Sequence, residues 1–324
     1  MDPKKEWAMF TGSQNAQTRS IDNANLIQRL KKPTGIVDVV LDTDTYNEID
    51  DQYALAYMIK SSEKLNPKAI YAAPFFNFKS SSPEDGMEKS YSEILNVLEL
   101  MDREDLKPIV HKGSRRFLLD ENTPERSEAV EDLIRLSKSY SKEKPLYVIS
   151  IGAITNIASA ILLDPEIIDR IVVIWLGGHA VHWPNNKEFN LCHDVAAARI
   201  IFGCGVPLVQ LPCMGVVSAF TTSGPELEYH LRGKNKLCDY LIDVTEEAAR
   251  ISYGENVWTR PIWDVTAVAW LLDGDFEEDC LMASPIPEYD DHYAFNPNRH
   301  LIKYVYNIKR DNLFGDLFEK LSRK

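Results

Sequence analysis

Four aspartates stand close together in the segment VVLDTDTYNEIDDQYALA. Asp42 and Asp44 follow a hydrophobic run, and because side chains alternate along a strand, they are expected to share one side of it. Asp50 and Asp51 would occupy the first turn of the helix that follows, where the helix dipole favours negative charge. So many like charges repel one another unless a cation compensates them. Carboxylate oxygens suit a hard ion such as Ca²⁺ or Mg²⁺.

An ordinary structural role exists for each of these acids taken alone. Asp50 could cap the helix, and the other three could be solvated loop acids. Four acids at the carboxyl end of one strand favour a ligand site instead, because open parallel sheets bind their ligands at that edge. The segment therefore predicts a metal or sugar site.

Two later segments carry further candidate residues. Glu188 and Asn190, in KEFNLCHDVAAARIIF, precede a helix expected to start near Asp194. Alternation would put both on a common side, offering acceptors and donors to sugar hydroxyls, although an ordinary loop before a capping Asp194 explains the pattern equally well. Trp263 and Asp264 begin the helix of RPIWDVTAVAWLL. Taken alone, an acid at that place is usually a cap and a tryptophan is usually part of the core.

The elements that would position these residues alternate along the chain. Strands are predicted for short β-branched runs, at 36–41, 69–75, 107–110, 146–151, 171–176 and 206–211. Helices are predicted between them, at 50–60, 88–101, 123–138, 155–163 and 195–202. The alternation predicts an α/β fold, a single large domain with a mostly parallel central sheet flanked by helices. Residues 1–35 are interpreted as an N-terminal arm with a short helix at 23–31, and residues 36–324 as the domain itself.

Composition narrows the class of partner. The 324 residues carry a formal net charge of -13, which argues against nucleic acid and against an anionic membrane surface. The five cysteines are odd in number and form no CxxC pair, so we expect reduced thiols rather than a disulfide framework or a zinc ribbon. Without a signal-like N-terminus or a long apolar run, a cytoplasmic protein with a small-molecule substrate is predicted.

In this order, the three segments resemble the inosine–uridine preferring nucleoside hydrolase family, from about Ile36 to near the C-terminus. That family has a strand, a DxD motif, a short loop and DD at a helix start. By this match Asp44 would be a Ca²⁺ ligand and the general base, and Asp51 a bidentate ligand. Asp50 would accept a hydrogen bond from a ribose hydroxyl. The resemblance thus implies that residues 36–324 form a catalytic domain that cleaves ribonucleosides to base and ribose with a calcium-bound water.

The resemblance extends to residues farther along the chain. It implies that the carbonyl of Ile151 and the carboxylate of Asp264 complete the Ca²⁺ ligands. It also implies contacts with the ribose, from Asn77, Asn186 (or its neighbour Asn185), Glu188 and Asn190. A homodimer or homotetramer is a further implication of the family.

The sequence departs from the family pattern at two places. The loop from Thr45 to Ile49 is two residues longer than usual, and its Asn47 could supply an additional ribose contact. Many members also carry a histidine before the late aspartate, as the acid that protonates the leaving base, where this chain has Trp263. The purine-preferring branch has tryptophan there and is thought to activate the base by stacking, so purine ribonucleosides are predicted. Alternative acids are the histidines at positions 179, 182 and 193.

Two other interpretations remain open from the sequence. LDTDT also matches the DxDxT motif of haloacid-dehalogenase-type phosphatases, in which the first aspartate is a phosphoryl nucleophile and Mg²⁺ is the ion. No later lysine or acidic motif in the expected order supports that enzyme. Alternatively, the chain is a ribose-binding relic that keeps the metal site but lacks leaving-group activation.

Overall fold

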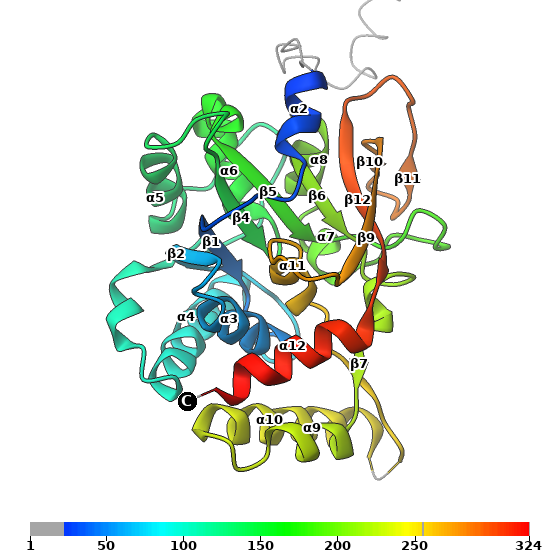
Figure 1. Ribbon diagram of the computed structural model, residues 1–324. Helices are drawn as coiled ribbons and strands as arrows, with labels where there is room; N and C mark the ends of the chain where they lie inside the picture. Colours follow the sequence, from blue (N-terminus) through cyan, green and yellow to red (C-terminus); the bar gives the residue numbers. More distant parts are fainter. Residues whose placement is uncertain (1–22, 255, 324) are drawn as a thin grey trace, which may run out of the picture.

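The computed structural model describes residues 23–254 and 256–323, and the predicted arm at 1–20 lies outside them. Its centre is an eight-stranded sheet in the order β3-β2-β1-β4-β5-β6-β12-β9 (Figure 1). The strands are β1 Val37–Thr43, β2 Leu65–Ala72, β3 Val110–Lys112, β4 Leu146–Ser150, β5 Ile171–Leu176, β6 Leu208–Leu211, β9 Glu277–Ala283 and β12 Leu301–Ile308. Only the pairing of β9 with β12 is antiparallel. The predicted mostly parallel α/β sheet is confirmed.

Helices and short ribbons surround this sheet. The α-helices are α2 Asn23–Arg29, α3 Asp50–Lys60, α4 Pro83–Leu100, α5 Glu128–Ser137, α6 Thr155–Leu163, α7 Phe189–His193, α8 Val195–Gly203, α9 Gly224–Leu231, α10 Lys236–Tyr253, α11 Val265–Ala269 and α12 Arg310–Ser322. The 3-10 helices are η1 Glu104–Ile109, η2 Pro165–Asp169 and η3 Val217–Ala219. Two small ribbons pair β7 Thr221–Thr222 with β8 Arg260–Pro261, and β10 Ile286–Pro287 with β11 Tyr293–Ala294.

The structure corrects the predicted elements at the edges of the sheet. The strand predicted at 107–110 is mostly the 3-10 helix η1, which contains Pro108, and the strand itself starts at Val110. Proline has no N–H to give to a strand ladder, which explains the shift. Strands β9 and β12 were not predicted from the sequence, because their burial is incomplete and they are not continuous apolar runs.

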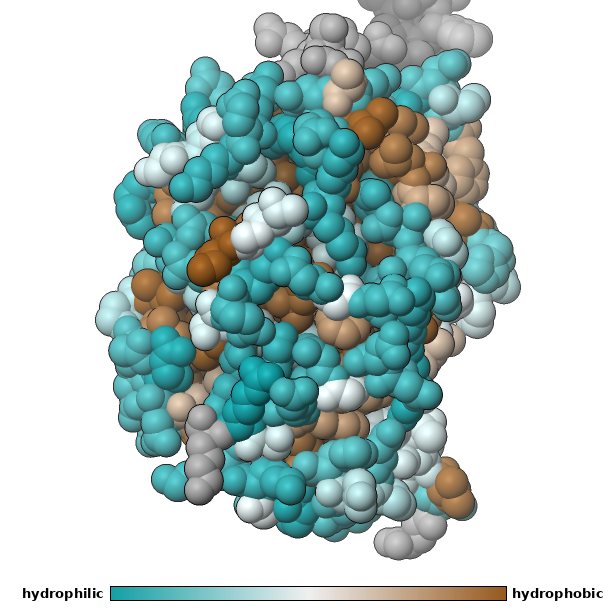
Figure 2. Space-filling model, viewed as in Figure 1, coloured by the Kyte–Doolittle hydropathy of each residue, from teal (hydrophilic) through white to brown (hydrophobic). Residues whose placement is uncertain are grey.

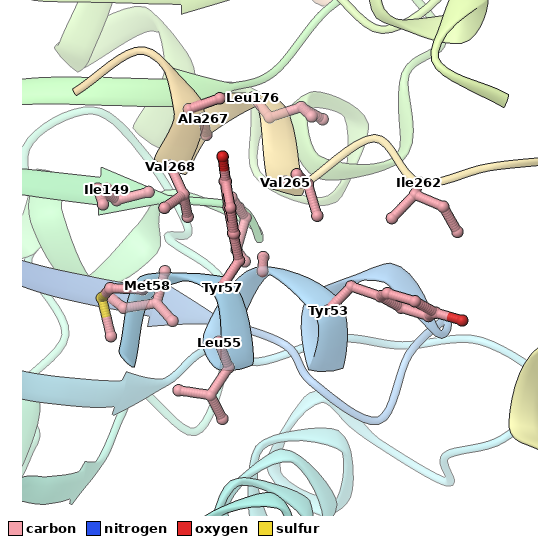
Figure 3. Close-up of a cluster of buried hydrophobic side chains, with 14 of the residues drawn as sticks. Tyr53, Leu55, Tyr57, Met58, Ile149, Leu176, Ile262, Val265, Ala267 and Val268 are labelled. Atoms are coloured by element: carbon pink, nitrogen blue, oxygen red, sulfur yellow. The ribbon is translucent and has the colours of Figure 1, made fainter. Parts of the chain in front are cut away.

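Two hydrophobic cores cover the two faces of the sheet. Val39 and Leu41 of β1 belong to one core, and Val40 belongs to the other, because successive side chains of a strand point to opposite faces. Figure 3 shows part of the first core, where Tyr53 of α3 and Val265 of α11 lie among apolar neighbours. Hydrophilic residues cover most of the surface seen in Figure 2. None of the helices in the described part of the chain is long and apolar enough to cross a membrane.

The strand order creates a switch point beside β1. This strand pairs with β2 on one side and with β4 on the other, and the chain crosses the sheet in opposite directions from there. Ligands of open α/β sheets bind in the crevice at the carboxyl ends of strands at such a point. The first helical turn of α3 and the start of α11 both lie at this edge, and α11 packs against β4 and β5 (Figure 1).

Candidate active site

A cavity of about 310 Å³ opens at the carboxyl ends of the central strands. It is lined by Asp44, Asn47, Glu48, Asp50, Asp51, Ile151, Leu176, His179, Lys187, Glu188, Phe189, Asn190, Cys213, Met214, Trp263 and Asp264. These residues come from six separate stretches of sequence, all of which end at the same edge of the sheet. The volume suits a ligand of small-molecule size.

Carboxylates from the starts of α3 and α11 meet at the floor of this cavity. One oxygen each of Asp50, Asp51 and Asp264 lie within 4.8 Å of one another, and all three residues are buried. The Asp264 N–H donates to Asp50 Oδ2 at 3.2 Å, and Thr43 Oγ1 donates to Asp51 Oδ1 at 2.5 Å. Neither Asp50 nor Asp264 caps its helix with its side chain, so the alternative role as ordinary caps is excluded. Asp51 and Asp264 are close enough to share one ion.

Asp44 lies beside this group and lacks donors. Its Oδ2 is buried and has no hydrogen-bond partner within residues 23–254 and 256–323. Burial, and then the charges of Asp51 and Asp50, raise the pKa of Asp44 well above its ordinary value. A buried carboxylate oxygen without a partner costs free energy unless a cation or a proton occupies it.

The neighbouring acids are perturbed in the same direction. Burial raises the pKa of Asp51 to about 6, and burial together with the nearby Glu48 raises that of Asp50 to about 8. Burial and the charges of Asp50 and Asp51 raise the pKa of Asp264 well above its ordinary value. The protein's own groups therefore do not balance the negative charge of this site. Its all-oxygen donor set fits a hard divalent cation.

Asp42 does not belong to this group, which corrects the prediction that it would stand with Asp44. It does not line the cavity. Asn156 Nδ2 donates to its Oδ1 at 2.8 Å, and Ser150 Oγ donates to its Oδ2 at 3.0 Å. Burial raises its pKa to about 7. Both oxygens are thus engaged away from the cavity, so Asp42 is badly placed to be the nucleophile of a phosphatase.

Ile151, just after β4, lines the cavity as expected, and Asn190 holds its backbone in place. Asn190 Nδ2 donates to the carbonyl oxygens of Ile151 and Leu176, both at 3.0 Å. One carboxamide therefore ties the ends of β4 and β5 together beside the acids. A carbonyl oxygen has two lone pairs, so the Ile151 oxygen can accept this bond and still face a cation.

Glu188 is placed by a helix rather than by a strand, which corrects the expected alternation with Asn190. It caps the short helix α7, and its carboxylate accepts from the N–H groups of Asn190 at 2.9 Å and Leu191 at 2.8 Å. Gly178 N–H donates to it as well, at 2.9 Å. Gly178 has φ +76°, and a Cβ there would lie 2.0 Å from the hydroxyl of Tyr293, so only glycine fits. Asp194 caps α8, as its position suggested.

The other three predicted asparagines occupy different places. Asn47 lines the cavity, whereas Asn77 and Asn186 do not. Asn77 lies behind Asn47 and donates from Nδ2 to Asn47 Oδ1 at 2.6 Å. Asn186 Oδ1 accepts from the N–H of His179 at 2.7 Å, and its buried Nδ2 has no partner among the described residues. Asn77 and Asn186 therefore support residues of the cavity wall.

Trp263 forms part of that wall. The ring is partly buried, and its Nε1 is buried without a hydrogen-bond partner in the described chain. The guanidinium carbon of Arg260 lies 5.7 Å from the ring centroid, and Arg260 Nη2 donates to Glu48 Oε2 at 2.5 Å. The tryptophan thus stands next to an ion pair that joins the loop before α3 to β8.

A family model for inosine-uridine preferring nucleoside hydrolases matches residues 39–288, more than half of the chain. The chain belongs to this family. The pyrimidine-specific ribonucleoside hydrolase RihA of Escherichia coli O1:K1 is 29% identical to this nucleoside hydrolase family member over 195 residues. That match covers 53% of this chain and 58% of the relative. RihA of Salmonella dublin is 27% identical over 264 residues, covering 72% of this chain and 79% of the relative.

Solved nucleoside hydrolases share the fold. The purine-preferring ribonucleoside hydrolase from Gardnerella vaginalis superposes with a TM-score of 0.71 at 20% identity, over 88% of this chain and 98% of that one. A plant nucleoside hydrolase gives 0.70 at 19% identity, over 90% and 100%. The resemblance stated from the motifs is confirmed at the level of family and fold. The similar proteins include pyrimidine-specific hydrolases and a purine-preferring one.

Of the three histidines considered as acids in this nucleoside hydrolase family member, His179 alone is among the residues that line the cavity. Its Nδ1 accepts from the Met214 N–H at 3.2 Å, which assigns the proton of the neutral ring to Nε2. Burial lowers its pKa. His193 instead contacts the carbonyl of Phe76 through Nε2, at 2.8 Å, and stacks on Phe117.

Arg260 was not predicted as a site residue from the sequence, and neither was Glu48. The two residues are 212 positions apart, and nothing local marks either as part of a site. The longer loop at 45–49 was the one available signal, because an insertion beside a DxD motif places additional side chains at the cavity.

Proposed function

We propose that this protein hydrolyses the N-glycosidic bond of ribonucleosides, with purine ribonucleosides preferred, and that it depends on Ca²⁺. The observation that carries the proposal is the buried, unpartnered Oδ2 of Asp44 beside three further buried acids in one cavity. Membership of the nucleoside hydrolase family supports the reaction class.

The residues present fit a bound cation. Its ligands would be carboxylate oxygens of Asp44, Asp51 and Asp264 and the carbonyl oxygen of Ile151, because all four residues line the cavity. Such a cation would supply positive charge that orients the attacking water and lowers its pKa. Ca²⁺ prefers all-oxygen sites of this kind.

The chain's own residues then have distinct tasks. Asp44 accepts the proton of the attacking water, because the residue lines the cavity and its Oδ2 has no donor among the described residues. Asp50 and Asn190 bind ribose hydroxyls, and the Asn190 carboxamide oxygen accepts no hydrogen bond from the described residues. The surrounding carboxylates, with Glu188 among them, stabilise the positive charge that develops on the ribosyl ring. Ribonucleosides should therefore outperform 2′-deoxyribonucleosides, which leave these polar groups unpaired.

Trp263 supports the preference for purines. It lines the cavity, and a stacked indole contributes about 0.5–1.5 kcal/mol beyond area burial. A purine N7 can take a proton from solvent or from an acid that relays it. His179 is the histidine that lines the cavity and could be this acid. Uridine offers no such nitrogen.

The experiment is a reducing-sugar assay with inosine, guanosine, uridine and 2′-deoxyinosine. The protein is first stripped with a chelator and then supplied with Ca²⁺ or Mg²⁺. We expect free ribose from inosine only after Ca²⁺ is restored, and less turnover of uridine. Turnover of p-nitrophenyl phosphate without release of ribose would instead indicate a phosphatase. Cation binding without turnover of any riboside would indicate a ribose-binding relic.

The same assay on Trp263→Ala tests the base preference. We expect a loss of purine turnover of roughly 2- to 12-fold, which corresponds to the stacking contribution. Unchanged purine turnover would make Trp263 a core residue. We keep a homodimer or homotetramer and a cytoplasmic location as predictions, which sedimentation velocity and cell fractionation test.

A further inference from the structure

Glu48, Arg260 and Trp263 form a connected group, here called the Glu48 clamp. Arg260 Nη2 donates to Glu48 Oε2 at 2.5 Å, and the same guanidinium lies over the ring of Trp263, 5.7 Å from its centroid. The second carboxylate oxygen, Oε1 of Glu48, accepts no hydrogen bond from residues 23–254 or 256–323. One cation therefore holds both an aromatic ring and an acid, and the acid keeps one free acceptor.

The clamp brings Glu48 and Trp263 together in the wall of the cavity that would hold the base. Glu48 and Trp263 both line the cavity, whereas Arg260 does not. Because the guanidinium covers one face of the indole, a flat ligand in the cavity has the other face to stack on. Since Arg260 contacts both residues, the Glu48 carboxylate and the Trp263 ring are held at the same part of the cavity wall.

We propose that Glu48 is a specificity-determining residue whose free Oε1 accepts an N–H hydrogen bond from the edge of the base that stacks on Trp263. The inference rests on the proposed function and names the substrate class within it. Favoured bases have an N–H donor on the ring or an exocyclic amine, as hypoxanthine, guanine and adenine do. The unsubstituted purine of purine riboside has no such donor.

Arg260 is a positioning residue for this contact. Glu48 stands close to the buried acids, as its effect on the pKa of Asp50 shows, and would be repelled by them once they ionise. The Arg260 charge offsets this repulsion and orients the carboxylate through a hydrogen bond between charged groups. Arg260→Lys keeps the charge but loses the planar guanidinium that can cover the ring, so it should retain only part of the effect.

The experiment measures kcat/KM for inosine and purine riboside with the Ca²⁺-loaded full-length protein. The ratio of the two values is compared between the wild type, Glu48→Gln and Arg260→Lys. Differences in the intrinsic reactivity of the two substrates cancel, because the same pair is used with every variant. Glutamine replaces a charged acceptor with a weaker one and adds an N–H₂ that suits the acceptor N1 of purine riboside. We expect the inosine to purine riboside ratio to fall roughly 10- to 100-fold in Glu48→Gln.

Glu226 provides a matched control. Arg310 pairs with it and also covers an aromatic ring, with its guanidinium carbon 4.6 Å from the centroid of Phe314. Glu226 does not line the cavity. Glu226→Gln should therefore leave the substrate ratio unchanged while it breaks a comparable ion pair.

The outcomes separate the two proposals. If Glu48→Gln and Arg260→Lys lower turnover of both substrates by the same factor, Glu48 only supports the cavity wall or contacts the ribose, and the inference is overturned. If the wild type releases no ribose from any riboside, the proposed function itself fails and the inference fails with it. Thermal melts of each variant show whether the fold is kept, and a variant that folds with an unchanged ratio counts against the inference.

Discussion

Asp42 and Asp44, at the carboxyl end of β1, have opposite hydrogen-bonding environments. On one side, Asp42 receives hydrogen bonds from Asn156 and Ser150 on its two oxygens. On the other, Asp44 has a buried oxygen with no donor in the described chain, next to Asp51 and Asp50, whose charges raise its pKa. Asp42 and Asp44 are two positions apart and are both buried. The two acids therefore differ in the donors available to them and not in burial.

The surroundings of Asp42, here called the donor side, are built from β4 and α6. Ser150 ends β4 and Asn156 lies in the first turn of α6, so both are fixed by the sheet and by the loop that follows it. The cavity side faces the starts of α3 and α11, whose own acids add charge where donors would be needed. Such an imbalance costs the fold stability, and binding of a cation or a proton restores it.

The largest effect is expected from placing the same isosteric substitution on both sides. Asp44→Asn should lower kcat by about 10³–10⁴-fold, because it removes the general base and one cation ligand. Asp42→Asn should retain most activity, because its amide can still accept from Asn156 and donate to Ser150. Steady-state kinetics of both variants with inosine, at saturating Ca²⁺, test the comparison. Equal losses of kcat would break it.

A moderate effect on stability is expected when the Asp42 carboxylate is removed. Asp42→Ala leaves the Asn156 amide and the Ser150 hydroxyl without their acceptor, at a cost of about 1–3 kcal/mol for each buried group. Asp44→Ala should not destabilise the cation-free protein, since no donor loses its partner and a repulsive charge is removed. Urea unfolding in the presence of a chelator measures both. A larger loss for Asp44→Ala would contradict the assignment.

The smallest effect on activity is expected from Glu277, a buried acid far along the chain. Both of its carboxylate oxygens lack partners in the described residues, and burial raises its pKa to about 8, opposed by the charge of Lys32. It stands outside the cavity. Glu277 therefore tests whether an unpartnered buried acid matters for activity when it lies outside the group of acids in the cavity. Glu277→Gln should leave turnover of inosine unchanged.

The same variant should show its effect on stability with pH. The folded-state pKa of Glu277 lies above its ordinary value of 4.5, so the wild type loses stability as pH rises from about 4.5 through 8. Glutamine does not titrate. The free energy of unfolding of Glu277→Gln, relative to that of the wild type, should increase over this pH interval. Above it, the difference between the two should stay constant. Urea melts at pH 5, 7 and 9 measure the difference, and parallel profiles would refute it.

Much of the site could be predicted from local sequence. Asp44 directly follows β1, and the first turn of α3 contains Asp50 and Asp51. The three carboxylates therefore come close to one another within ten residues of chain. The order of strands and helices likewise predicted a mostly parallel sheet, and with it the edge at which ligands bind. Periodicity could say this much because it reports which element a residue is in and which of its faces is buried.

Only the tertiary structure decided which acids face the cavity and which residues join them. Whether Asp42 meets donors depends on Ser150 and Asn156, more than 100 positions away, and whether Glu48 meets a cation depends on Arg260. Such partners are set by how strands neighbour one another in the sheet and by where loops cross its edge. Electrostatic and hydrogen-bond energies act over a few ångströms of space, and a sequence does not record which distant residues share that space.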